Sequence, residues 1–399
     1  MKTLDPAIDR TYTATQQLVP YGHPHATNKG MSWRKQKTLQ LHRALTSDPI
    51  DIDTLRSAAV GEGGLLSQEI RRKVWPKLLN VNVFCLPAKP GPAVRCNHKD
   101  YNQVEMDVRR SVRRFPAGMR DAERSILQQQ LMDIILFVLQ SHPELHYYQG
   151  YHDIAVTLLL TVGPRLATAM LSTLSTHHLR DFMEHTMDHT KHMLNYLMPL
   201  IQSQSTPLHD FLFRSEVGYI FALSWLITWY GHVLSDYHQV LRLYDFFLAS
   251  HPLMPVYCAA QMVLMREQDI LSVDCDMPSV HQLLSNIPKD FPFEDLVSRA
   301  HTLFHRHPPS DVVKRASLQK YKSISSTSFH SLLVSSSSQR PDFVLCKQTV
   351  TESKALLPRS QNTLVKVAVW GLSASLGAVA LVITQSALEW GPEILLGLF

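Results

Sequence analysis

Two short segments of this chain carry polar side chains at spacings that suit chemistry on phosphate groups. In the first, VEMDVRRSVRRFP, Asp107 and Arg110 lie three positions apart on an expected helix and therefore share a face. A carboxylate in that place can hold a guanidinium in one pose, and a guanidinium binds phosphate oxygens through a planar fork of donors. The same spacing also fits a solvated basic helix end that includes Arg113 and Arg114.

The second segment is HYYQGYHDI, which runs from His146 to Ile154 and follows a turn marked by Pro143. It contains two adjacent tyrosines, the first being Tyr147, and then Gln149 and Gly150. A glutamine amide can donate a hydrogen bond to one oxygen and accept one from a water in the same pose. A satisfied polar residue at a helix start is the alternative interpretation.

The sequence offers little support for other kinds of reactive site. No GxxxxGK(S/T), GxGxxG or GxSxG motif is present, so the chain is not expected to bind a nucleotide or another cofactor of its own. His185, His189 and His192 recur on one face of an expected helix, which is a convergence that metal binding needs. Because that segment is otherwise polar and lacks HExxH, we favour an exposed polar face over a metal-dependent hydrolase.

Composition excludes several classes of protein. Of the 399 residues, 45% are hydrophobic, which is enough for a sizeable core and rules out disorder over the full length. The net charge is +5 with acids interspersed among the bases, whereas a nucleic-acid binder usually gathers its Lys and Arg in one stripe. The 5 cysteines form no CxxC pair, which indicates a reduced, cytosol-facing chain without disulfides or zinc.

The elements that must position these residues are helices. Apolar residues in the segment 126–139 recur at i, i+3, i+4 and i+7, and strand-like alternation is scarce throughout. Trp225 and Trp229 lie four positions apart in an apolar stretch and are expected in the core. The apolar run from Phe246 to Met265 contains His251, Pro252 and Pro255, so we predict two buried helices there rather than a membrane span. The fold class is therefore all-α.

The C-terminal region contains a second long apolar run, Val367 to Leu388, which has no ionisable residue. At about 1.5 Å per residue these roughly 22 positions reach about 33 Å, which is enough to cross a bilayer core. Basic residues precede the run and acidic residues follow it, which places the bulk of the chain in the cytosol. The run predicts a tail anchor, whose modest length suits the thin membrane of the endoplasmic reticulum. A buried core helix or an amphipathic surface helix is the alternative.

These observations together predict five consecutive parts. They are a flexible N-terminal lead-in (1–32), a helical domain (33–308, core 61–264), a Ser-rich flexible linker (309–364), a transmembrane tail anchor (365–388) and a short lumenal tail (389–399).

Three short motifs in order carry a resemblance to a known family. They are R-x-x-x-W from Arg71 to Trp75, V-x-x-D-x-x-R from Val104 to Arg110, and Y-x-Q from Tyr147 to Gln149. Their order and spacing resemble the TBC domain of Rab GTPase-activating proteins, and the later segments FALSWLITWYGHVL and RLYDFFL are similar to that family as well. The resemblance departs from the pattern at Val104, where the family has Ile, and at His146, where it often has Gly.

The resemblance implies an all-α TBC fold and a dual-finger mechanism, in which this chain is a GTPase activator and not a hydrolase by itself. Arg110 would be the arginine finger, selected over its neighbour Arg109 by the motif alone, and Gln149 would orient the attacking water. The supporting residues would be Asp107 and Tyr147, which steady the fingers, and Arg71 with Trp75, which are mainly structural.

The resemblance also implies the partners. The partner would be a Rab in its GTP state, of the type that acts in traffic from the endoplasmic reticulum to the Golgi, and it would bring GTP and Mg²⁺ with it. The expected location is the endoplasmic reticulum membrane, with the early Golgi as a further location and the catalytic domain facing the cytosol. A membrane-tethered scaffold that binds Rab without stimulating hydrolysis is the alternative.

Overall fold

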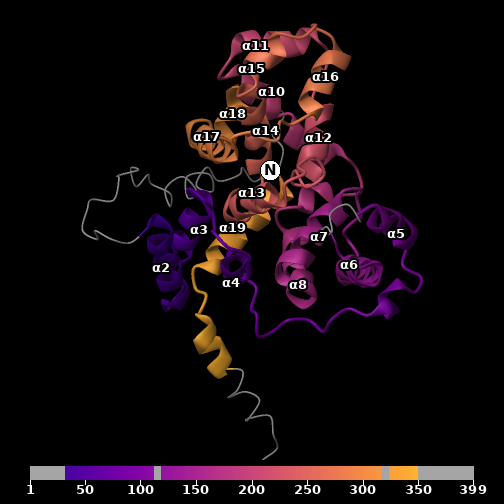
Figure 1. The fold of residues 1–399 in the computed structure, drawn as a ribbon, viewed down its shortest axis with the longest axis vertical. Helices are drawn as coiled ribbons and strands as arrows, with labels where there is room; N and C mark the ends of the chain where they lie inside the picture. Colours follow the sequence, from indigo (N-terminus) through magenta and orange to yellow (C-terminus); the bar gives the residue numbers. More distant parts are fainter. Residues whose placement is uncertain (1–31, 112–117, 316–322, 349–399) are drawn as a thin grey trace, which may run out of the picture. The chain divides into compact units, whose positions relative to one another are not determined.

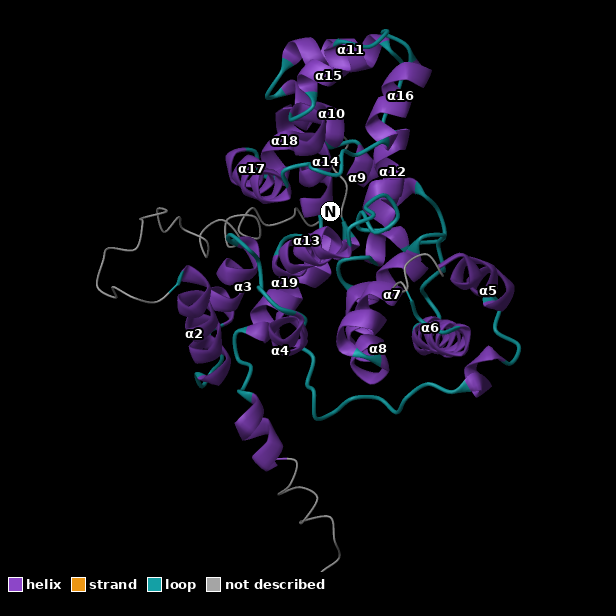
Figure 2. Ribbon diagram, viewed as in Figure 1, coloured by secondary structure: helices purple, strands orange, loops and turns teal. Residues whose placement is uncertain are grey.

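The computed structural model describes residues 32–111, 118–315 and 323–348 of the chain. In these ranges every regular element is a helix and there is no strand, as Figure 2 shows. The chain divides into two units, residues 1–344 and 345–399, and the helices from Trp33 to Ser336 belong to the first. The prediction of an all-α fold is confirmed.

The first half of the helical unit consists of α2 (Trp33–Thr46), α3 (Ile52–Val60), α4 (Gln68–Leu78), the 3-10 turn η1 (Pro92–Arg95), α5 (Tyr101–Arg110), α6 (Asp121–Ser141), α7 (Tyr151–Val162) and α8 (Pro164–Thr176) (Figure 1). After the 3-10 turn η3 (Arg180–Phe182) follow α9 (Asp188–Leu194), α10 (Leu197–Gln202), α11 (Thr206–Arg214), α12 (Ile220–Ile227) and α13 (Tyr237–Ala249). The last described elements are α14 (Met254–Leu264), α15 (Glu267–Leu271), α16 (Met277–Ser285), α17 (Phe293–Arg306), α18 (Pro309–Arg315) and α19 (Ile324–Ser336).

Two helices that are buried on nearly all sides organise the core. α7 contacts α4, α5, α6 and α8, and α14 contacts α10, α12 and α17. A helix that is apolar all round gains most of its stability from such surroundings, because it has no face that prefers water. Trp225 and Trp229 are buried in this core, as their spacing predicts.

The apolar run of residues 246–265 is broken into the two predicted buried helices. α13 ends at Ala249 and α14 begins at Met254, with Pro255 in its first turn, where a missing N–H costs nothing. Among the described residues, no helix combines the length and apolarity that a membrane crossing needs. The predicted anchor at 365–388, the tail after it and nearly all of the lead-in at 1–32 lie outside the described residues.

The predicted flexible linker at 309–364 is wrong for the part of it that the structure describes. Residues 309–315 form α18, residues 324–336 form α19, and residues 342–348 are helical again. Phe329 and Leu332 of α19 are buried, being 1% and 4% exposed. Serine-rich composition disfavours an isolated helix, but a few apolar side chains at helical spacing suffice when a tertiary surface receives them.

Hydrogen bonds from earlier parts of the chain hold both ends of this segment. The Asp181 carboxylate accepts bonds from the Ser323 hydroxyl (2.6 Å) and from the Ile324 N–H (3.0 Å), which caps the start of α19. Beyond its end, the Arg340 guanidinium donates two bonds to the Asp48 carboxylate, at 2.5 and 2.8 Å. The described residues of the predicted linker up to 344 are therefore part of the helical unit.

We expect the buried His251 to make stability fall in acid. Burial lowers the pKa of His251 from 6.5 to about 3, and its Nδ1 accepts a bond from the Leu253 N–H at 3.1 Å. Below pH 6.5 the unfolded chain therefore binds a proton that the folded chain does not. The free energy of unfolding should drop by about 2 kcal/mol between pH 7 and pH 5 from this group. Denaturant unfolding at both pH values measures it, and His251→Asn should flatten the slope; an unchanged slope would contradict the assignment.

Candidate functional site

Helix α5 separates one buried carboxylate from two exposed guanidinium groups. Its buried residues are Val104, Asp107 and Val108, at the helical spacing of the side that faces α6 and α7. The Asp107 carboxyl group is almost fully buried, whereas the Arg110 side chain is 66% exposed. The Arg110 Nη1 lies 3.5 Å from the Asp107 Oδ1, so a fixed anion anchors a cation that projects outward.

The Asp107 carboxylate also joins α5 to the loop before α7. Its Oδ2 accepts a hydrogen bond from the Tyr147 hydroxyl at 2.9 Å and another from the Gln103 amide at 3.1 Å. Burial and the adjacent carboxylate raise the pKa of Tyr147 well above its usual value, so the phenol keeps the proton that it donates. These donors offset the cost of burying the charge of Asp107.

Gln149 lies two residues after Tyr147 and is exposed at the turn that precedes α7. Gly150 follows with φ +115°, and a Cβ there would lie 3.0 Å from the Thr228 Cγ2. Only glycine meets both constraints without strain. The turn is therefore held between Tyr147 on one side and the end of α12 on the other, and it presents the Gln149 amide at the surface.

The two adjacent arginines of α5 have different partners in the structure. In the sequence, only the motif distinguishes them. The Arg109 Nη2 donates to the Glu105 Oε1 at 2.8 Å, and its side chain is 74% exposed. Arg110 instead lies beside the carboxylate that holds Tyr147. Arg110, Asp107, Tyr147 and the turn with Gln149 thus form one connected group, and Arg109 belongs to a surface ion pair outside it.

The remaining two predicted residues, Arg71 and Trp75, belong to a different buried cluster. The Arg71 guanidinium donates to the Asp245 carboxylate through Nε (2.9 Å) and Nη2 (2.8 Å), and the Trp75 indole N–H donates to the same group at 2.8 Å. The Leu65 N–H adds a fourth donor at 2.9 Å. Gly64 lies so close that a Cβ there would be 2.5 Å from the Asp245 Oδ2. This cluster ties α4 to α13.

Three residues that contact these clusters were not predicted from the sequence. Asp245 is a lone acid inside the apolar segment RLYDFFL, and an isolated charge in a buried helix is a signal that it needs partners. Gln103 precedes Asp107 by one helical turn, and His152 lies 3.3 Å from the Tyr147 hydroxyl through its Nδ1. Neither of these two carries a spacing that marks it in the sequence.

The histidine face predicted at 185–192 offers no set of three ligands. The His189 Nδ1 lies 3.4 Å from the Asp181 Oδ1, which is the carboxylate that caps α19. Within the described ranges, no group of three or more His, Cys, Asp or Glu side chains is arranged to hold a metal ion.

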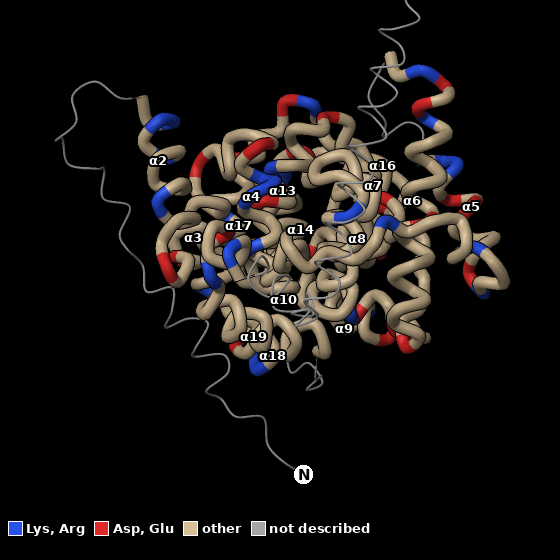
Figure 3. The backbone as a smooth tube through the Cα atoms, turned by 90° about the horizontal axis from the view of Figure 1, so that it is seen from below, with Lys and Arg blue, Asp and Glu red and all other residues tan. Residues whose placement is uncertain are grey.

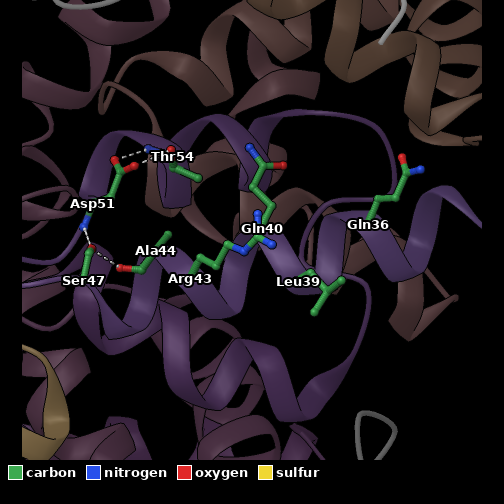
Figure 4. A pocket seen from close by; sticks show the side chains of 8 residues that line it. All are labelled: Gln36, Leu39, Gln40, Arg43, Ala44, Ser47, Asp51 and Thr54. Atoms are coloured by element: carbon green, nitrogen blue, oxygen red, sulfur yellow. Dashed lines mark hydrogen bonds between the residues drawn. The ribbon is translucent and has the colours of Figure 1, made fainter. Parts of the chain in front are cut away.

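A pocket with a volume of about 380 Å³ lies between α2 and α3, away from the predicted site residues (Figure 4). Its polar lining already serves the helix ends: the Asp51 carboxylate accepts from the Thr54 N–H and hydroxyl, and the Ser47 hydroxyl accepts from the Asp51 N–H. Along α2, which lines the pocket, every Lys, Arg, Asp or Glu position is basic, whereas α5 carries both acidic and basic positions (Figure 3). The connected group on α5 and the turn before α7 is therefore the candidate site.

Residues 68–271 of this chain, about half of it, match the family model of the Rab-GTPase-TBC domain. The chain belongs to the Rab-GTPase-TBC domain family. The matched TBC region contains every residue of the two clusters described above except Gly64 and Leu65.

Relatives extend the similarity beyond the TBC domain. The chain is 56% identical to human TBC1 domain family member 20 over 375 residues, which cover 92% of this chain and 93% of the relative. It is 34% identical to the GTPase-activating protein gyp10 of Schizosaccharomyces pombe over 62% of this chain and 67% of the relative. The crystal structure of the Ypt/Rab-GAP domain of Gyp1p has the same fold, with a TM-score of 0.54 at 17% identity over 67% of this chain and 97% of that one.

We expect Asp245→Asn to destabilise the domain strongly. The change leaves the Arg71 guanidinium buried without its counter-charge, which typically costs about 3–5 kcal/mol of unfolding free energy. Denaturant unfolding of the full chain in detergent measures the loss. The matched control is Glu105→Gln, which removes the partly exposed partner of the exposed Arg109 and should cost about 1 kcal/mol or less. A loss at Asp245 no larger than the control would contradict a structural role for this cluster.

Proposed function

We propose that this protein is a GTPase-activating protein for Rab GTPases of the early secretory pathway and supplies an arginine and a glutamine in trans. The observation that carries the proposal is the connected group on α5 and the turn before α7. An exposed guanidinium, Arg110, and an exposed amide, Gln149, are linked through the partly buried Asp107–Tyr147 hydrogen bond. Membership of the Rab-GTPase-TBC domain family supports the same partner class.

Arg110 acts as the arginine finger in this proposal. Phosphoryl transfer builds negative charge on the γ-phosphate oxygens and on the bridging oxygen, and a guanidinium placed beside them stabilises that charge. Such a finger accelerates hydrolysis by about 10³–10⁵-fold, or about 4–7 kcal/mol of the barrier. The ion pair with Asp107 limits the poses of the side chain before the partner arrives, so less entropy is lost on binding.

Gln149 orients the attacking water, for which its amide has both a donor and an acceptor. Gln149 lies on a short turn between Tyr147 and Gly150, and contacts at both of these residues hold the backbone of the turn in place. Its side chain can therefore reach a partner without a backbone movement. GTP and Mg²⁺ are the substrate and metal of the partner Rab, and the reaction forms no covalent intermediate with this chain. Catalysis then consists of positioning and electrostatic stabilisation.

We further propose that residues 365–388 anchor the protein in the endoplasmic reticulum membrane, with the helical domain in the cytosol. The apolar run of 367–388, which lacks ionisable residues, supports this, as do the basic residues before it and the acidic residues after it. An anchor of this kind restricts the protein to Rabs on the same membrane, which raises their effective concentration.

We predict that Arg110→Ala lowers stimulated GTP hydrolysis by about 10³-fold or more, because the charge on the γ-phosphate loses its partner. Arg110→Lys should fail almost as badly, since an ammonium cannot replace the bidentate fork. Phosphate release from a panel of purified GTP-loaded Rabs measures both. The matched control is Arg109→Ala, which should have the lesser effect because Arg109 pairs with Glu105.

Equal losses from Arg109→Ala and Arg110→Ala would refute the assignment of the finger. The scaffold alternative has its own outcome in the same assay. If the wild-type protein binds GTP-loaded Rab and no member of the panel shows faster phosphate release, the protein is a Rab-binding scaffold and the proposed activity is wrong.

Deletion of residues 367–399 should release the protein into the cytosolic fraction, because the apolar run is then missing. Fractionation of cells that express each form measures this. A matched control replaces 367–388 with an unrelated apolar span of the same length, which should keep the protein on membranes. Membrane retention of the deleted form would show that another part of the chain binds the membrane.

A further inference from the structure

The imidazole of His152, in the first turn of α7, lies between two buried carboxylates. Its Nδ1 is 3.3 Å from the Tyr147 hydroxyl and 4.0 Å from the Asp107 Oδ2, and its Nε2 is 3.7 Å from the Asp153 Oδ2. All three partners are themselves buried or partly buried, and His152 is 8% exposed. The ring therefore contacts the group that links the two proposed fingers without being exposed enough to reach a partner protein.

The hydrogen-bond donors and acceptors of this group favour one tautomer of the ring. The Tyr147 hydroxyl has one proton and donates it to the Asp107 Oδ2 at 2.9 Å. A hydrogen bond between its oxygen and the His152 Nδ1 then requires that the nitrogen supplies the proton. Both the neutral Nδ1–H ring and the doubly protonated ring satisfy this condition.

The other tautomer would release the tyrosine. An Nδ1 without a proton presents a lone pair to the Tyr147 hydroxyl, which then has two competing acceptors, the ring and the Asp107 carboxylate. Whenever the hydroxyl turns to the ring, Asp107 loses a donor and its charge is less well satisfied. The Arg110 guanidinium beside the Asp107 Oδ1 is then held by a less ordered anion.

We propose that His152 is a positioning residue for the arginine finger: its Nδ1–H holds the Tyr147 hydroxyl on Asp107 and so keeps Arg110 in its productive pose. The inference deepens the proposed function and rests on it. The ring touches no substrate, so its effect passes through Tyr147 and Asp107.

The charged groups around the ring come from several elements. Asp107 and Arg110 belong to α5, Asp153 belongs to α7, and His232 follows α12. The Asp153 Oδ2 lies 3.6 Å from the Nδ1 of the half-exposed His232, so Asp153 lies between the Nε2 of one ring and the Nδ1 of the other. These contacts lie on the Nε2 side of the His152 ring, away from the Nδ1 that faces the Tyr147 hydroxyl.

The kinetic test compares three substitutions of His152 in the full chain in detergent. His152→Asn places an amide N–H near the former Nδ1 and should keep kcat within about 2-fold of wild type, since one donor replaces another. His152→Leu and His152→Gln remove a donor at that place, and kcat should fall by about 10-fold with KM for GTP-loaded Rab unchanged. Losses of equal size in all three variants, or losses confined to KM, would overturn the proposal.

A second variant separates positioning from damage to the fold. Tyr147→Phe removes the hydroxyl on which the ring acts, so adding His152→Leu to it should lower kcat no further. Additive losses in the double variant would mean that His152 acts elsewhere, and thermal unfolding of each variant identifies any that fails to fold.

The tautomer itself is measurable without a Rab. ¹⁵N chemical shifts of histidine-labelled protein distinguish an Nδ1–H ring from an Nε2–H ring, and we expect a proton on the His152 Nδ1 near neutral pH. A ring protonated only on Nε2 would overturn the inference. A wild-type protein that stimulates no Rab would instead overturn the proposed function, even where the Nδ1–H tautomer is found, so the two failures are distinguishable.

Discussion

The site depends on a single buried carboxylate, that of Asp107. An ionised group inside a protein is stable only when donors surround it, and here three donors come from two segments: Gln103 and Arg110 on the same helix and Tyr147 on a distant loop. Because each donor satisfies the charge in part, moving any one of them disturbs the others. The carboxylate thus holds α5 and the turn before α7 in one arrangement, from which a guanidinium and an amide face outward.

A second buried carboxylate, that of Asp245, is also stabilised by surrounding hydrogen-bond donors, but it has a structural role. Its donors are Arg71, Trp75 and the Leu65 backbone, and its surroundings exclude water almost completely. No member of that cluster projects to the surface, so it fixes the packing of α4 on α13 and offers nothing to a partner. The motif residues predicted from the sequence therefore divide between two anions: one group supports the scaffold, and the other presents an exposed guanidinium and an exposed amide.

The C-terminal part of the helical domain shows how composition can mislead. A run of serines predicts a flexible linker because serine competes with the helical backbone for hydrogen bonds. In the structure, the Asp181 carboxylate accepts hydrogen bonds from Ser323 and Ile324 and so caps the start of α19. Phe329 is buried among side chains that are far away in sequence. Neither Asp181 nor the surface that receives Phe329 is visible from the local sequence, so the helix could not be predicted from composition.

The sequence by itself determined the all-α class, the broken helix pair at 246–265, the burial of the two core tryptophans and the shared face of Asp107 and Arg110. Each follows from spacing along one chain segment, where helical periodicity dictates which side chains are neighbours. Only the tertiary structure decided that Tyr147 reaches Asp107 across forty residues of sequence, that Arg109 lies outside the site, and that Asp245 gathers Arg71 and Trp75. These contacts join segments that are brought together by packing of the whole core. The periodicity within one segment does not determine that packing.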